Sequence, residues 1–156
     1  APDLTEAKSH SYDLFAAKKK LDEASDTYDD TRESYAHNTY NVRSARHTYE
    51  AALYEYKMSV QSFEMNFRSA FDSVKDYAQV LRSAQTSLAF QESSYASMEM
   101  KYRQGTISHN ELLAAEDTLA EAKEAVETAR RNQFTAYRTY YWAVNYGVTS
   151  SGQTGT

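Results

Sequence analysis

The stretch YRQGTISHNELL, residues 102–113, divides two segments that otherwise carry the signals of uninterrupted helix. Gly105 is the first glycine of the chain, and its access to positive φ lets it end a helix at the C′ position. Ser108 and Glu111 then form the S-x-x-E pattern of a capping box, which begins the next helix. Ile107 and Leu112 stand where two apolar side chains form a hydrophobic staple. These residues predict a helical hairpin with its tip at residues 105–108.

The composition indicates an all-α fold of one domain. The chain has 156 residues, a single proline at position 2 and four glycines, three of them after residue 146. A β or α/β domain needs many more turn residues than these. The fourteen tyrosines predict a core built from Tyr and Ala, which suits thin helix–helix contacts.

A heptad stripe of apolar residues can be followed from Leu14 to the tip. A repeat near 3.5 residues predicts one helix over about 11–104 that packs as a left-handed coiled coil. We expect the tyrosines of this stripe to serve helix packing and assembly; they are Tyr28, Tyr35, Tyr49 and Tyr56. Residues 37–41 are poor in helix formers, and a break there would fold the chain back into a three-helix bundle.

The second predicted helix covers about 109–146 and has a ladder of alanines at heptad spacing. We expect close helix contacts at these alanines, which are Ala115, Ala122, Ala129, Ala136 and Ala143. Gly147 marks the end of the helix. The predicted organisation is a polar lead-in at 1–10, one elongated hairpin domain at 11–147, and a flexible Ser/Thr/Gly tail at 148–156.

The two predicted helices differ greatly in length, which bears on partners. A helix of about 38 residues covers only the second half of one that spans 11–104. The stripe in the first half then lacks a partner within the chain, and soluble monomers avoid such apolar surfaces. The sequence therefore favours a homo-oligomer, with the three-helix bundle as the intramolecular alternative.

No pattern of residues in the sequence indicates enzymatic chemistry. The four histidines, His10, His37, His47 and His109, do not pair at helical ligand spacing, so we expect no metal site. Phosphate-binding glycine loops and catalytic serine motifs are absent, so we expect no cofactor and no catalytic residues. The net charge of −5 argues against a nucleic-acid partner. Neither a membrane-spanning helix nor a membrane strand pattern of about 10 residues is predicted.

Two features are typical of an exported protein. The chain has no cysteine, and its first residues, APDLTEA, resemble the mature end that a signal peptidase leaves. We expect the protein in the cell envelope (periplasm) or outside the cell.

The segments FRSAF (67–71), AQTSL (84–88) and YRQG (102–105), continued by Ser108 and ELL (111–113), resemble the last helical hairpin of the TolC-like outer-membrane efflux family. The resemblance covers about residues 60–148. It implies that hairpins from several protomers pack into an α-helical barrel, with Tyr102, Gly105 and Glu111 at its entrance and an adaptor protein docked at the tip. Where that family often has a further acidic residue after Glu111, this chain has Ala114. Family members also carry two hairpin repeats, whereas one is predicted here.

These observations lead to one main hypothesis of function and two alternatives. The main hypothesis is a non-enzymatic exported coiled-coil protein that assembles through TolC-like helical packing into an α-helical tube or an extracellular filament. One alternative is the periplasmic α-barrel part of an efflux or type I secretion conduit. The other is a monomeric three-helix interaction module.

Overall fold

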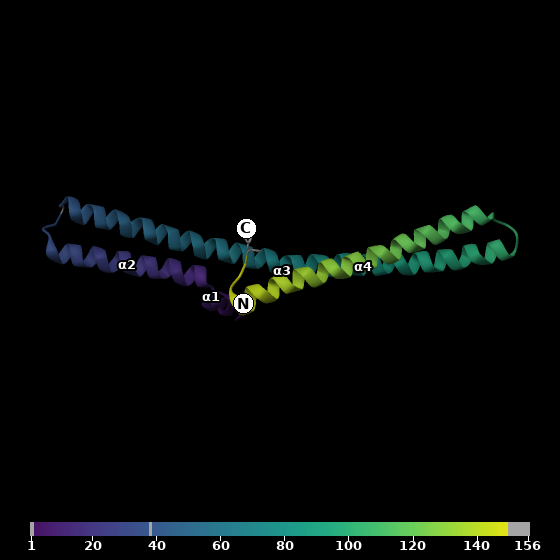
Figure 1. Cartoon of the computed structure of the whole chain (residues 1–156), viewed down its shortest axis with the longest axis horizontal. Coiled ribbons are helices and arrows are strands. Elements are labelled where there is room, and N and C mark those ends of the chain that lie inside the picture. Colours follow the sequence, from purple (N-terminus) through teal and green to yellow (C-terminus); the bar gives the residue numbers. More distant parts are fainter. Residues whose placement is uncertain (1, 38, 150–156) are drawn as a thin grey trace, which may run out of the picture. The chain divides into compact units, whose positions relative to one another are not determined.

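This computed structural model describes residues 2–37 and 39–149, and the regular secondary structure in these ranges is all α-helix. The helices are α1 (Pro2–His10), α2 (Tyr12–Ser34), α3 (Tyr40–Arg103) and α4 (His109–Tyr146) (Figure 1). No strand occurs in these ranges, so the all-α prediction is confirmed. The tail predicted at 148–156 lies outside the described residues from 150 onward.

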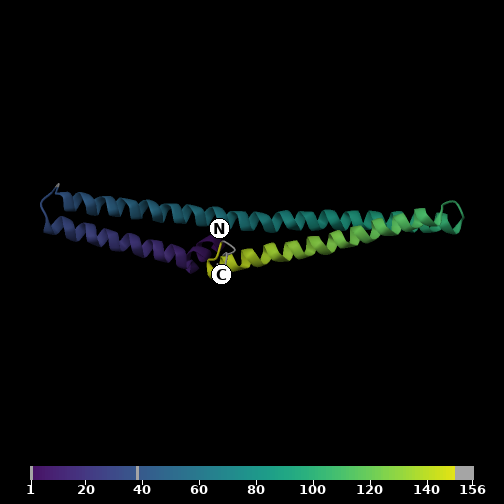
Figure 2. The same ribbon diagram turned by 45° about the horizontal axis from the view of Figure 1, so that its top comes forward.

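The helices form two compact units, and α3 and α4 contribute to both. The first unit comprises residues 1–70 and 139–156, and the second comprises residues 71–138. In the second unit the end of α3 and the beginning of α4 make the predicted antiparallel hairpin (Figure 2). Its interior is lined by half-buried Val74, Leu81 and Leu88 of α3 and by buried Val126 and Ala129 of α4. These are members of the predicted stripe and ladder.

In the first unit the chain folds back, and the prediction of one helix over 11–104 is wrong. Helix α2 ends at Ser34, and α3 begins at Tyr40 and runs antiparallel to it (Figure 1). The rings of Tyr28 and Tyr49 stack with centroids 5.9 Å apart, and Lys20 forms an ion pair with Glu55. The first half of the heptad stripe therefore has a partner within the chain.

The turn occurs at the poor helix formers noted in the sequence. Tyr35 has an extended backbone (φ −127°, ψ 149°), and its N–H donates to the Thr31 carbonyl at 3.1 Å, which ends α2. The heptad spacing of the apolar stripe continues across this turn, from Tyr28 through Tyr35 and Val42 to Tyr49. Periodicity therefore did not reveal the reversal.

Residues 2–10, expected as a polar lead-in, form the short helix α1. Its start next to Pro2 agrees with the preference of proline for the first turn of a helix. Ser11 separates α1 from α2 and caps α2, because its Oγ accepts from the Leu14 N–H at 3.4 Å. Ala7 on α1 is fully buried, so this segment belongs to the core.

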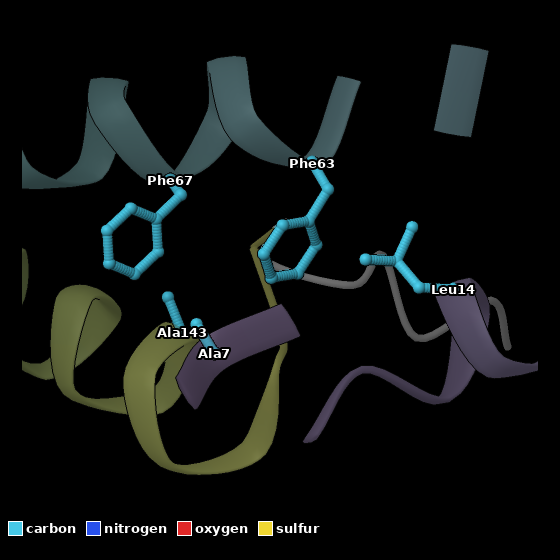
Figure 3. Packing of buried hydrophobic residues seen from close by; sticks show 5 residues of the cluster. All are labelled: Ala7, Leu14, Phe63, Phe67 and Ala143. Carbon is cyan, nitrogen blue, oxygen red and sulfur yellow. The ribbon is translucent and has the colours of Figure 1, made fainter. Parts of the chain in front are cut away.

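The core of the first unit is a small cluster drawn from all four helices. Phe63 and Phe67 of α3 point toward Ala7 of α1 and Ala143 of α4, and Leu14 of α2 lies beside Phe63 (Figure 3). Small side chains on α1 and α4 leave room for two phenyl rings from α3. Large residues from one helix thus fill the space beside small residues from its neighbours, as close packing requires.

Gly147, which directly follows α4, lies against the junction of α1 and α2. Its φ of +63° and the bond from its N–H to the Ala143 carbonyl (3.1 Å) identify it as the C′ residue of α4, as predicted. A Cβ at this position would lie 2.4 Å from the Ser11 backbone nitrogen and 2.6 Å from the His10 carbonyl carbon. Only glycine lets the end of α4 approach the backbone of the N-terminal segment this closely.

We expect Gly147→Ala to destabilise the protein by about 2 kcal/mol or more, because the added methyl group meets backbone atoms as well as an unfavourable φ. Gly105→Ala is the matched control, since Gly105 has a similar φ of +73° but no atom within 4 Å of the place that the added methyl group would take. Urea unfolding of both variants measures the difference. An equal loss of stability in the two variants would show that the approach to Ser11 does not constrain residue 147.

Candidate functional site

The predicted tip begins with a complete C-terminal cap on α3. The N–H of Gly105 donates to the Tyr102 carbonyl at 2.9 Å, and the N–H of Thr106 donates to the Lys101 carbonyl at 3.0 Å. These two bonds are the 5→2 and 6→1 bonds of a Schellman motif, which satisfies carbonyls at the helix end. The stop signal at Gly105 is confirmed.

The other side of the tip is the predicted capping box of α4. The Glu111 N–H donates to Ser108 Oγ at 3.3 Å. In return, Glu111 Oε2 accepts from the Ser108 N–H at 2.7 Å and from the Ser108 hydroxyl at 2.8 Å. The bond from the Ser108 N–H, followed by that from its hydroxyl, lowers the pKa of Glu111. The carboxylate that the resemblance assigned to an entrance is therefore engaged in closing the turn.

Aromatic side chains flank this turn. The ring of Tyr102 lies 5.9 Å from that of His109, at an interplanar angle of 44°, and is 41% exposed. Ile107 and Leu112, the expected staple, are both half-buried. The tip is therefore a rigid turn with one exposed tyrosine. Its role as an entrance or adaptor site stays a prediction.

We expect Glu111→Ala to lower the thermal midpoint at pH 7 and to have a smaller effect near pH 3. The pKa of Glu111 is lowered in the folded protein, so its contribution is present above about pH 4.3, the pKa of an unfolded glutamate. The contribution is lost as the pH falls through the folded-state pKa.

The matched control for this prediction is Glu121→Ala. Glu121 is exposed on the same helix and forms no ion pair with described residues. Calorimetric midpoints of both variants and the parent at the two pH values give the comparison. A Glu111 effect independent of pH would contradict the capping role of the charged carboxylate.

The alanine ladder faces the interior of the chain. Ala129, Ala136 and Ala143 are buried, and Ala115 and Ala122 are half-buried. The predicted assembly tyrosines also lie largely within the α2–α3 pair: Tyr28, Tyr49 and Tyr56 are half-buried, whereas Tyr35 at the turn is exposed. Whether any of these residues also contacts another molecule stays a prediction.

An open groove of about 1310 Å³ runs between α2 and α3 near their turn. Small side chains line much of it, among them Ala24, Thr27 and Thr31 of α2 and Ala45, Thr48 and Ala52 of α3. The groove holds no cluster of three or more metal-ligating side chains, and none occurs elsewhere in residues 2–37 and 39–149.

Two polar contacts of α1 have no counterpart among the motifs of the sequence. The Tyr140 hydroxyl donates to Asp3 Oδ2 at 2.7 Å, and Lys8 Nζ lies 2.5 Å from Glu64 Oε1. The hydrogen bond from Lys8 and its charge, with a smaller contribution from Arg68, lower the pKa of Glu64. These partners are 137 and 56 residues apart, so no local pattern could have paired them. The two contacts connect α1 to α4 and to α3.

A third contact joins the same segments. Nδ1 of His10 lies 3.2 Å from the Val144 carbonyl oxygen, so this ring nitrogen carries the proton and donates. Together with the close approach of Gly147 to Ser11, it places the end of α1 against the last turn of α4. Hydrogen bonds therefore surround the apolar cluster of the first unit.

We expect Tyr140→Phe to destabilise the protein by about 1 kcal/mol at pH 8, because it removes the hydrogen bond to Asp3. Burial, then the bond and the charge of Asp3, raise the pKa of Tyr140 to about 12. The contribution is therefore complete below about pH 10, the pKa of an unfolded tyrosine, and is lost as the pH rises through the folded-state pKa. The stability difference between variant and parent should shrink over that range.

Chemical unfolding at a series of pH values measures this difference. Tyr137→Phe, at a tyrosine that is 53% exposed on the same helix, is the control and should be near neutral throughout. A Tyr140→Phe effect that persists unchanged to the alkaline end of the series would contradict the role of the neutral hydroxyl.

In the described part of the chain, no helix combines the length and the apolar character that are needed to cross a bilayer. Searches of family models, curated proteins and solved structures return no match for this chain. Its function must therefore be argued from its own residues.

Proposed function

We propose that this protein is a non-enzymatic, exported coiled-coil protein that self-associates through its helices into a tube or filament. The observation that carries the proposal is the imbalance between its buried and exposed apolar side chains. Twenty large apolar side chains in the described residues are exposed, on every helix from α2 to α4. A soluble monomer of this size rarely leaves so much apolar surface in water.

Few large apolar side chains are buried in the described residues. The large apolar side chains classed as buried are Leu14, Leu21, Phe63, Phe67 and Val126, and the remaining buried apolar residues are alanines. Burial of a large apolar side chain contributes about 1.5–3 kcal/mol, so this core supplies modest stability against the entropy of ordering the chain. Contacts between copies would add the apolar burial that the single chain lacks.

Aromatic residues dominate the exposed set, which fits a protein interface. Tyr12, Tyr40, Tyr54 and Phe90 are each more than two-thirds exposed, and the rings of Trp142 and Tyr146 lie with centroids 4.7 Å apart at an interplanar angle of 33°. Tyrosine and tryptophan are enriched at interfaces because a ring buries much area at low entropic cost. The resemblance of residues 60–148 to hairpins that pack side by side also supports assembly.

We expect the purified protein to have a solution mass that is a multiple of 17.8 kDa and that falls on dilution. Sedimentation velocity over a dilution series measures this mass, and negative-stain images distinguish closed tubes from open filaments. Tyr54→Glu and Met58→Glu should lower the mass, whereas Lys123→Glu, at an exposed lysine of α4, is the control. A monomer at every concentration would overturn the proposal in favour of a monomeric helical module.

A further inference from the structure

Helix α3 carries a second, largely apolar stripe within the first unit, away from its core residues Phe63 and Phe67, and four of its members (Tyr40, Ser44, His47 and Ala51) also line the open groove beside α2. Tyr40, Tyr54, Met58 and Met65 are 78%, 68%, 63% and 65% exposed. With heptad letters assigned to this face, they belong to two rows of exposed residues, here called the outer stripe. Row a is Ser44, Ala51, Met58 and Met65, and row d is Tyr40, His47, Tyr54 and Gln61.

The outer stripe has the spacing of a coiled-coil seam, in addition to the seam that faces α2. A surface helix normally has one apolar face, and a helix with apolar residues on opposite faces packs on both. The residues of this sequence that the structure does not describe (1, 38 and 150–156) include no large apolar side chain. They therefore offer nothing that would cover the outer stripe.

The charges beside the stripe indicate what covers it. The g positions that flank row a alternate in sign: Arg43, Glu50, Lys57 and Glu64. Residues at g set the orientation of a coiled-coil partner through ion pairs. Because the charges alternate in sign along this row, the row is complementary in charge to the same row of a second helix that runs in the opposite direction.

We infer that the outer stripe binds the same stripe of a second copy, antiparallel and about a two-fold axis near residues 52 and 53. In this register the g rows place Arg43 opposite Glu64 and Glu50 opposite Lys57 of the second copy. Two-fold symmetry repeats each pair, so the four pairs are all between opposite charges.

The same register pairs small side chains with large ones at the centre of the stripe. Ala51 lies opposite Tyr54 of the second copy, so a small residue meets a large one there. Met65 lies opposite Tyr40, and the polar residues Ser44 and Gln61 lie opposite each other, whereas the third polar member, His47, lies opposite Met58. Every layer pairs an a residue with a d residue, as knobs-into-holes packing of antiparallel helices requires.

A parallel pair is disfavoured by the same charges. Parallel coiled coils pair g with the following e position. Glu50 of each copy would then lie opposite Glu55 of the other, which gives two repulsive pairs. Arg43 and Lys57 form no ion pair with residues in the described ranges, so both are available to a second copy. Glu50 already lies near Arg46 and His47, and Glu64 near Lys8 and Arg68, so each carboxylate would join a four-residue network.

This inference rests on the proposed self-association and specifies its partner and orientation. Because the chain has no cysteine, disulfide trapping in the full-length protein tests the orientation directly. A mixture of S44C and Q61C proteins should form a disulfide-linked dimer under mild oxidation, and S44C alone should not. Dimers from S44C alone would show a parallel pair and overturn the inference.

Charge exchange tests the register independently. K57E turns two attractive pairs into repulsive ones, and we expect dimerisation to weaken roughly tenfold in low salt. The double exchange E50K/K57E restores opposite charges in the antiparallel pair and should recover affinity. K123E controls for the change in net charge.

The two proposals fail in different ways. Self-association that survives with unchanged affinity in K57E and yields no S44C–Q61C disulfide would overturn the antiparallel stripe while leaving assembly intact. A monomer at all concentrations would overturn assembly and, with it, this interface. Recovery in E50K/K57E together with the mixed disulfide would establish both.

Discussion

The first unit depends on the contact between the end of α4 and the α1–α2 junction. Gly147 has no side chain, so its backbone reaches that of Ser11, which is itself 3% exposed and caps α2. Gly147 thus sets where α4 ends and how closely that end approaches the start of α2, which Ser11 caps. Phe63 and Phe67 can then pack against the small residues Ala7 and Ala143.

The hairpin tip could be predicted from the sequence. The sequence did not decide whether the chain reverses between α2 and α3. Stop and start signals at Gly105, Ser108 and Glu111 act through bonds between residues no more than five apart, so local sequence reveals them. The helix bounds 109–146 follow from the same signals. The turn after Ser34 lacks glycine and proline, and the heptad spacing of the apolar residues continues across it, so neither signal marks the reversal.

The contacts of α1 were beyond any local pattern. Ser11 with Asp13 two residues later is a weak start signal for α2, but nothing near Asp3 or Lys8 indicates Tyr140 or Glu64 as a partner. The sequence analysis predicted that the apolar stripe before about residue 60 has no partner within the chain, and the structure corrects this. Its inner stripe packs on α2, and the contact with a second copy that we propose uses the outer stripe of α3 instead.

Sequence distance in these contacts has a consequence for the order of folding. The second unit closes across a turn of a few residues, so its hairpin forms from local contacts alone. The first unit needs Asp3 to meet Tyr140 and Ser11 to meet Gly147, so it is completed only after α4 has been synthesised. Until then α1 and α2 lack one wall of their core, whereas the hairpin of the second unit needs no residue of α1 or α2.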